Sequence, residues 1–374
     1  MGKLFVLFLL LILGQPAMLI AQLPFFDHPE RIALVKQGGD YIYNLEQDSA
    51  DLYIQKVKKE LPGHPIGPLM EGIQLLWKHL PVLDDPTFDQ FLDKMKEAVA
   101  KAQSLGKADE DHPEALFFEL AARGLMAEYF ADRDEYRQAL SEATKAYALV
   151  KRGFDLTDEI SEFLFTTGLY NYFREKYPQM YPIYKPFVWI FKSGDKELGL
   201  AQLDKATRET VVSRIEAHIY ISYIYLRYED TPVKAQEYLS FLVEQYPNNL
   251  YLISKYLEAF RDEAFLPSVP LPYIKKLQGS TRPYFRLAGN VFMGLYQERV
   301  KNNYREAFDL YGEGIRHGEE LTSHGEFYKS LAYLGMGRIL ADDRPEAAQV
   351  HLEQALEYAE TKDVKKEART LLRR

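Results

Sequence analysis

Potential metal ligands gather in one short stretch of this chain, which has eight histidines and no cysteine. In the segment HGEELTSH, His317, Glu320 and His324 could meet around an ion. The Gly, Thr and Ser residues of this segment instead indicate a helix end and a turn, and no Asp, Cys or second carboxylate pair completes a ligand set. The sequence also has no phosphate-binding glycine loop, so we expect neither a metal nor a nucleotide cofactor.

Patterns that could support catalysis have simpler structural explanations. Ser193 and Lys196 have the spacing of Ser-x-x-Lys, but Gly194-Asp195 between them predicts the start of a helix, with Ser193 or Asp195 as its N-cap. Paired carboxylates could cleave a glycosidic bond, yet the pairs here are expected at helix ends, where the helix dipole or solvation accounts for them. We therefore predict no enzyme; the acidic groups concerned are Asp84-Asp85, Asp109 to Asp111 and Glu319-Glu320.

The composition predicts a large folded core and argues against nucleic-acid binding. Of 374 residues, 47% are hydrophobic, the net charge is -9 and the basic residues are scattered. Proteins that bind nucleic acid need a basic stripe to neutralise phosphates. Only the final segment, KDVKKEARTLLRR, concentrates positive charge, and this is typical of a solvated helix end.

The first residues have the layout of a secretory signal, with Lys3, an apolar run from Leu4 to Leu13, and Ala21-Gln22. The alternative is an uncleaved anchor, but the stretch is short and contains Gly, Gln and Pro. We expect residues 1–21 to be removed and residues 22–374 to form a single soluble domain without stable membrane insertion. The absence of cysteine excludes an acylated lipoprotein, and a large core without disulfides in an exported chain favours the periplasm or envelope of a bacterium.

Proline positions predict that the chain is all-α. Seven segments place a polar capping residue beside or near a proline and continue with an apolar pattern of helical period. Proline suits the first helical position because it has no N–H to leave unpaired. The segments are DHPE at 27 and at 111, GHPIG at 63, DDPTF at 84, EDTPVKA at 229, STRPY at 280 and DDRPEAA at 342.

The helices also repeat. Gly38, Tyr41, Ala50, Ile54 and Pro62 match the spacing of the tetratricopeptide pattern, in which small residues let two helices of a hairpin approach closely. Further copies carry one extra residue in the turn, or are looser. They are Ser222, Tyr225, Ala235, Leu239 and Pro247; Gly294, Ala307 and Tyr311; Gly335, Ala348 and Leu352; and Gly124 with Ala139 and Ala143.

The sequence therefore resembles the tetratricopeptide-repeat superfamily over most of residues 22–374. This resemblance implies a right-handed superhelix, an α-solenoid of about seven or eight helical hairpins. The stretch GLYNYF to GDKELGLAQLDKA further resembles a branch of exported bacterial repeat proteins, and a related helix pair occurs in a fungal mitochondrial and lipid-droplet-associated family. The resemblance implies a fold and a binding class, and no reaction.

An aromatic and proline-rich insertion interrupts the repeat at residues 177–193. Gly168 to Ser222 spans 54 residues, against a norm of about 34. We predict that proline at every fourth position prevents a regular helix there and that the insertion forms a buried plug. The prolines are Pro178, Pro182 and Pro186, and the rings expected to point inward are Tyr181, Tyr184, Phe187, Trp189 and Phe191.

The resemblance implies that the first helix of each hairpin lines a concave groove. The expected groove is apolar, so a chaperone-type clamp for a peptide carboxylate is not predicted. It either binds a protein or peptide partner, as in a non-catalytic scaffold, or is filled by the chain's own insertion. The alternative functions are a helical carbohydrate-active enzyme and a glycan-binding accessory protein. The expected groove residues are Phe165, Leu169, Tyr172, Ile219, Tyr223, Leu226, Val291 and Leu295.

Overall fold

The computed structural model describes residues 25–180, 191–261, 266–321 and 323–373, and this part of the chain is all-α without a strand. This confirms the predicted all-α class. The expected signal segment and the central residues of the insertion lie outside the described residues.

Successive helices pair into hairpins, while α12 packs more extensively on α13 than on α11. The helices are α1 (Pro29–Tyr43) with α2 (Gln47–Glu60), α3 (Ile66–His79) with α4 (Asp85–Leu105), α5 (Pro113–Asp132) with α6 (Tyr136–Gly153), α7 (Phe163–Met180) with α8 (Lys196–Glu209), and α9 (Arg214–Arg227) with α10 (Pro232–Gln245). They continue as α11 (Leu250–Glu258) and α12 (Leu271–Gln278), α13 (Pro283–Arg299) with α14 (Tyr304–His317), α15 (Glu326–Leu340) with α16 (Pro345–Glu357), and α17 (Lys362–Leu371).

The helices begin where the proline and capping residues predicted them to begin. Each of the seven proline segments opens a helix, and in α4 the side chain of Asp84 accepts a hydrogen bond from Thr87 N at 2.9 Å. Asp195, one of the two caps predicted for the helix after the insertion, accepts from Leu198 N at 2.9 Å at the start of α8. Local capping chemistry therefore sets these boundaries.

Small residues let paired helices touch, as the repeat pattern predicts. A Cβ atom on Gly199 of α8 would lie 2.5 Å from the backbone nitrogen of Tyr172 and 2.8 Å from the carbonyl oxygen of Gly168, both in α7. A Cβ atom on Gly294 of α13 would lie 2.6 Å from the ring of Tyr311 in α14. A methyl group at either glycine would force these helices apart.

Gly124 does not make the close helix contact that the looser repeat copy predicts for it. It is exposed, and a Cβ atom there would meet nothing within 4 Å. The closely packed side of α5 instead carries larger side chains, including the buried Phe117, Phe118 and Met126. The register predicted for this copy is wrong.

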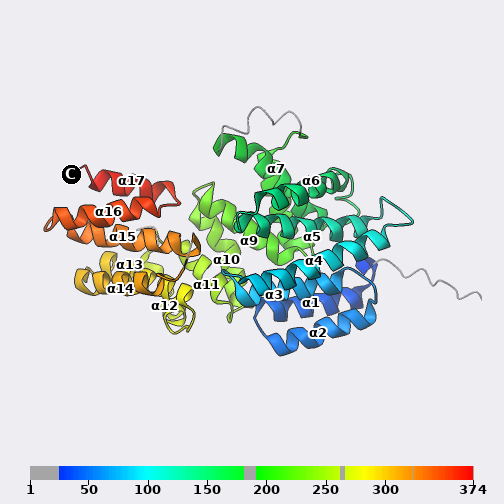
Figure 1. Ribbon diagram of the computed structural model, residues 1–374, viewed down its shortest axis with the longest axis horizontal. Coiled ribbons are helices and arrows are strands. Elements are labelled where there is room, and N and C mark those ends of the chain that lie inside the picture. Colours follow the sequence, from blue (N-terminus) through cyan, green and yellow to red (C-terminus); the bar gives the residue numbers. More distant parts are fainter. Residues whose placement is uncertain (1–24, 181–190, 262–265, 322, 374) are drawn as a thin grey trace, which may run out of the picture.

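The chain folds back so that its first helices meet helices from its middle. Asn249, which caps α11, donates to the carbonyl oxygen of Tyr43 at 2.8 Å, and Arg282 donates to the carbonyl oxygen of His79 at 2.6 Å. Helices α9 to α11 consequently lie between α1–α6 on one side and α13–α17 on the other (Figure 1).

The described ends of the insertion differ from the prediction. Helix α7 continues through Pro178 to Met180, because a proline in the last turn removes one amide hydrogen bond without ending the helix. Phe191 is 42% exposed and lies edge-on against Tyr147, with ring centroids 5.1 Å apart, so it does not point into the core. The other rings of the predicted plug, Tyr181, Tyr184, Phe187 and Trp189, lie outside the described residues.

Candidate functional site

Half of the predicted groove residues are buried in the core. These four side chains pack between helices and present almost no surface to a partner, which corrects the expectation that they line a groove. The register identified the apolar side of each helix, but neighbouring helices cover that side. They are Tyr172, Leu226, Val291 and Leu295.

Tyr172 belongs to an ionic cluster that joins α7 and α8 to Glu229, in the connection between α9 and α10. Its hydroxyl donates to Glu229 at 2.7 Å, and Lys176 and Lys196 donate to the same carboxylate at 2.8 and 2.9 Å. Burial alone would raise the pKa of Glu229, but these three hydrogen bonds lower it to about 2. Lys196, the lysine of the Ser-x-x-Lys match, is thus held in a structural ion pair.

The other four predicted groove residues lie on α7 and α9 and keep some exposure. Phe165, Leu169 and Ile219 are half-buried, and Tyr223 is 42% exposed. The rings of Phe165 and Tyr220 meet edge-on with centroids 5.5 Å apart, and the Tyr220 hydroxyl donates to Glu128 of α5. This contact brings the inner sides of α5, α7 and α9 together.

Five polar side chains form a surface at this meeting point, which we call the α5–α9 surface. On α9, successive members follow at intervals of four and three residues and therefore share one face of the helix. On α5, the two acidic members are four residues apart. The five are Glu128 and Asp132 of α5 and Glu216, Tyr220 and Tyr223 of α9.

The carboxylates of this surface have raised pKa values, although two of them, Glu128 and Asp132, are exposed. Glu128 is exposed, yet desolvation by the surrounding protein raises its pKa to about 7. The hydrogen bond from Tyr220 opposes this shift, while the charges of Asp132 and Glu216 add to it. Burial is also the main cause that raises the pKa of Asp132.

Glu216 connects the α5–α9 surface to the first helices of the chain. Its carboxylate accepts a hydrogen bond of 2.8 Å from the hydroxyl of Tyr43 and is also bonded by the side chain of Trp77. Burial nevertheless raises its pKa, because both donors are neutral groups. Neutral donors thus hold Glu128 and Glu216, and within the described part of the chain no cation pairs with either carboxylate.

The opposite end of α9 carries a compensated ionic cluster. Glu258 of α11 is 0% exposed, and it pairs with Arg227, with Lys255 at 2.9 Å and with the hydroxyl of Tyr328 at 2.9 Å. Burial alone would raise the pKa of Glu258, but the two cations lower it to about 2. This cluster holds α9, α11 and α15 together.

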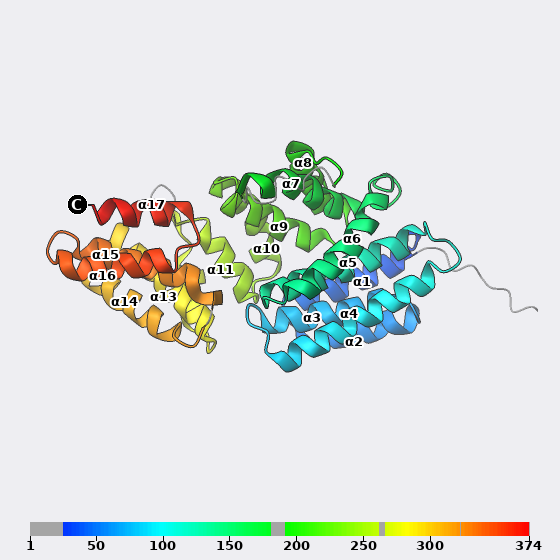
Figure 2. The same ribbon diagram turned by 45° about the horizontal axis from the view of Figure 1, so that its top comes forward.

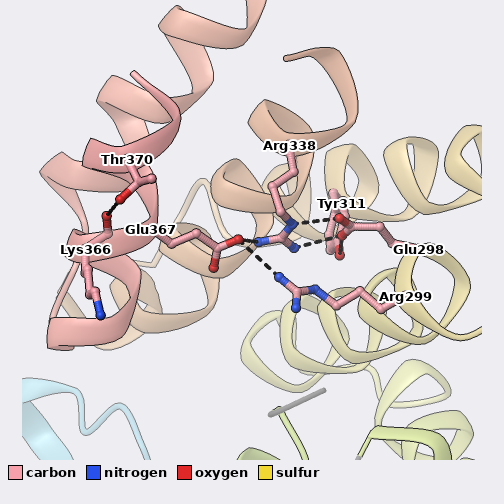
Figure 3. A network of polar contacts seen from close by, with 7 residues as sticks. All are labelled: Glu298, Arg299, Tyr311, Arg338, Lys366, Glu367 and Thr370. Atoms are coloured by element: carbon pink, nitrogen blue, oxygen red, sulfur yellow. Dashed lines mark hydrogen bonds and ion pairs between the residues drawn. The ribbon is translucent and has the colours of Figure 1, made fainter. Parts of the chain in front are cut away.

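A second compensated cluster ties the last helices to α13. Arg338 of α15 donates to both carboxylate oxygens of Glu298, at 2.7 and 2.9 Å, and to Glu367 of α17 at 3.0 Å. Arg299 reaches the same oxygen of Glu367 at 3.2 Å, and Tyr311 donates to Glu298 at 2.6 Å (Figure 3). All the charges of this cluster are paired within the protein, so its role is structural.

The described residues contain no group of three or more side chains suited to a metal ion. His317 lies 3.4 Å from Glu313, one turn earlier in α14, and the side chain of His324 is half-buried. Among the helices that the structure describes, none is both long and apolar enough to cross a bilayer.

Neither a known family model nor a curated protein matches this chain.

The acidic members of the α5–α9 surface were not identified from the sequence. Glu128 and Tyr220 lie 92 residues apart, and periodicity in either helix gives no indication of their contact. A signal was present in each helix, because Glu128 and Asp132 share a helix face with apolar residues, as do Glu216 and Tyr220. Acidic residues at inward positions of a predicted groove would have marked this surface.

Proposed function

We propose that this protein is a non-catalytic interaction scaffold of the bacterial cell envelope, exported after removal of residues 1–21. Its helical hairpins and their close contacts at Gly168 and Gly294 support a superhelix of the tetratricopeptide type. The partner is a protein or peptide that binds on the inner helices.

The observation that carries this proposal is the state of Glu128. Among the described residues, this exposed carboxylate receives a hydrogen bond from the neutral Tyr220 and forms no ion pair with a cation, and desolvation by the surrounding protein raises its pKa. A cation brought by a partner would offset this desolvation, because an opposite charge stabilises the ionised form. We therefore assign to the α5–α9 surface a partner segment that presents a lysine or arginine side chain.

The aromatic members of the surface fit the same chemistry. Tyr223 exposes its ring on the same face of α9 as the other α9 members of the surface. The rings of Phe165 and Tyr220, which contact each other, add apolar area to the surface. Aromatic faces attract lysine and arginine, and they also pack against the aliphatic parts of both side chains.

Affinity capture from bacterial envelope extract tests this function. Residues 22–374 should retain one or a few proteins, and Glu128→Lys should lose them because it places a cation where the partner's cation binds. Glu353→Lys makes the same charge change at an exposed site on α16 and should retain them. Retention of the same proteins by the Glu128→Lys variant would contradict the proposal.

A second candidate function, a helical carbohydrate-active enzyme, rests on the same residues. A carboxyl group with a pKa of about 7, one turn from a second carboxylate, is a pattern that general acid catalysis uses in glycoside cleavage. Release of reducing sugar from envelope glycans by the wild type, and not by Glu128→Gln, would favour this enzyme over the scaffold.

A further inference from the structure

Tyrosine hydroxyls donate to carboxylates at several places in this protein, and in five of them a lysine or arginine binds the same carboxylate. The cation offsets the cost of removing a carboxylate from water, which a neutral hydroxyl does only in part. The five are Asp40 with Arg214, Asp204 with Arg208, Glu229 with Lys176 and Lys196, Glu258 with Arg227 and Lys255, and Glu298 with Arg338.

Two tyrosine-bound carboxylates of the α5–α9 surface have no such cation within the described residues. Glu128 accepts from Tyr220 and Glu216 accepts from Tyr43, and in both pairs the tyrosine comes from another helix. Asp134 also lacks a cation there, but it accepts from a tyrosine two residues away in an exposed turn, where water solvates it. The α5–α9 surface therefore has an arrangement that a cation completes elsewhere in this molecule.

Asp132 adds a third carboxylate to this surface, in the last turn of α5. It is exposed, it follows Glu128 by one turn, and the negative end of the helix dipole disfavours a carboxylate at this position. The neighbouring Arg133 pairs with Asp85 instead. Among the described residues only the imidazole of His324 lowers the pKa of Asp132, and burial outweighs it.

The position of the surface leaves two carboxylates exposed side by side. Helices α9 to α11 lie between α1–α6 and α13–α17 in both views (Figures 1 and 2), and the α5–α9 surface is at the first of these boundaries, where Tyr220 reaches Glu128. Glu128 and Asp132 are exposed there, and one helical turn sets them about 6 Å apart. Two cations at this spacing pair with both carboxylates, whereas a single cation leaves one of them uncompensated.

We propose that the partner of the α5–α9 surface binds through a dibasic segment, with two lysine or arginine side chains about 6 Å apart. The proposal rests on the function proposed above and specifies the chemistry of the partner. In an extended segment, alternate side chains point to the same side and are about 6.6 Å apart, so two lysines separated by one residue have this spacing. Charge complementarity selects the segment, and the rings of Phe165 and Tyr223 offer apolar area to the aliphatic parts of its side chains.

Two labelled peptides of equal charge test the spacing. Both have about twelve residues of alanine and serine with two lysines, which are two positions apart in one peptide and nine positions, about 30 Å, apart in the other. Fluorescence anisotropy with residues 22–374 is measured at low ionic strength and at pH 8, where Glu128, with its pKa of about 7, is mostly ionised. The close pair of lysines should bind roughly tenfold more tightly than the separated pair. Equal binding of the two peptides, or binding of neither, would overturn the proposal.

Variants locate the two contacts on the protein. Glu128→Gln and Asp132→Asn each keep the shape of an exposed side chain, and each should abolish the preference for the close pair of lysines. Glu353→Gln removes a charge from an exposed site on α16 and should keep the preference. A preference that survives in both Glu128→Gln and Asp132→Asn would place the peptide elsewhere and reject the proposal.

The capture experiment separates this proposal from the function on which it rests. Capture of envelope proteins that Glu128→Lys abolishes, together with equal binding of the two peptides, would overturn the dibasic segment and leave the scaffold function in place. Capture that Glu128→Lys does not change would contradict both.

A free diamine is the competing occupant of the surface. Diaminobutane carries two ammonium groups at a similar spacing but has no backbone and no neighbouring side chains. It should displace the labelled close-pair peptide roughly tenfold more weakly than the unlabelled peptide does. Displacement as strong as that by the unlabelled peptide would assign the surface to a small amine and overturn the partner segment.

Discussion

Two carboxylates beside α9, one at its last turn and one at its middle, are held in opposite ways. Beside its last turn, Glu258 is fully buried and paired with Arg227 and Lys255, and its pKa falls to about 2. Beside its middle, Glu128 receives a hydrogen bond from Tyr220, and its pKa rises to about 7. A carboxylate that the fold needs comes with its own cations, whereas one that lacks them and remains accessible is available to a partner.

The largest effect should come from removing a cation of the compensated cluster. Arg227→Met leaves Glu258 buried with one of its two cations, and unpaired buried charge is costly. We expect a loss of about 3 to 5 kcal/mol in the free energy of unfolding, measured by urea denaturation. Arg208→Met, which removes an exposed arginine paired with Asp204, is the matched control and should cost less than about 1 kcal/mol.

The tyrosines that donate to the two carboxylates give the next comparison. Tyr328→Phe deprives the buried Glu258 of a donor and should destabilise the protein by about 1 to 3 kcal/mol. Tyr220→Phe removes the donor to Glu128, which can bind water instead, and should cost less than about 1 kcal/mol. Equal losses in the two variants would show that Glu128 and Glu258 are solvated alike.

The smallest effect concerns the pH dependence of stability. The pKa of Glu128 is higher in the folded protein than in the unfolded chain. The contribution of Glu128 to the free energy of unfolding is therefore fully present below about pH 4.5 and is lost as the pH rises through about 7. The glutamine of Glu128→Gln cannot ionise. At pH 8 the free energy of unfolding of this variant should therefore exceed that of the wild type by on the order of 1 kcal/mol, after allowance for solvent screening. At pH 4 the two proteins should unfold at nearly the same urea concentration.

The fold was more predictable from the sequence than the site, because helix boundaries depend on local chemistry. Pro113 and Asp195 mark the starts of α5 and α8 through capping that involves a few neighbouring residues. The small residues Gly168 and Gly294 likewise indicated where paired helices touch.

The candidate site depends on contacts that local patterns do not record. Val291 and Leu295 were predicted to face a groove, but α13 is surrounded by α12, α14 and α15, so its apolar side is core. The contact between Glu128 and Tyr220 arises because the chain folds back on itself. Proline spacing likewise predicted an early end for α7, although a single proline in a last turn removes too little hydrogen bonding to end it.

The most direct test of this account measures the ionisation of Glu128 and Glu258 in the folded protein. Carbon NMR of side-chain-labelled glutamate in residues 22–374, recorded from pH 3 to pH 9, follows each carboxyl group, and the Glu128→Gln and Glu258→Gln variants assign the two signals. We expect the signal of Glu128 to titrate near pH 7 and that of Glu258 to remain ionised down to the lowest pH at which the protein stays folded. A Glu128 signal that titrates below pH 5, like an ordinary surface glutamate, would contradict the account.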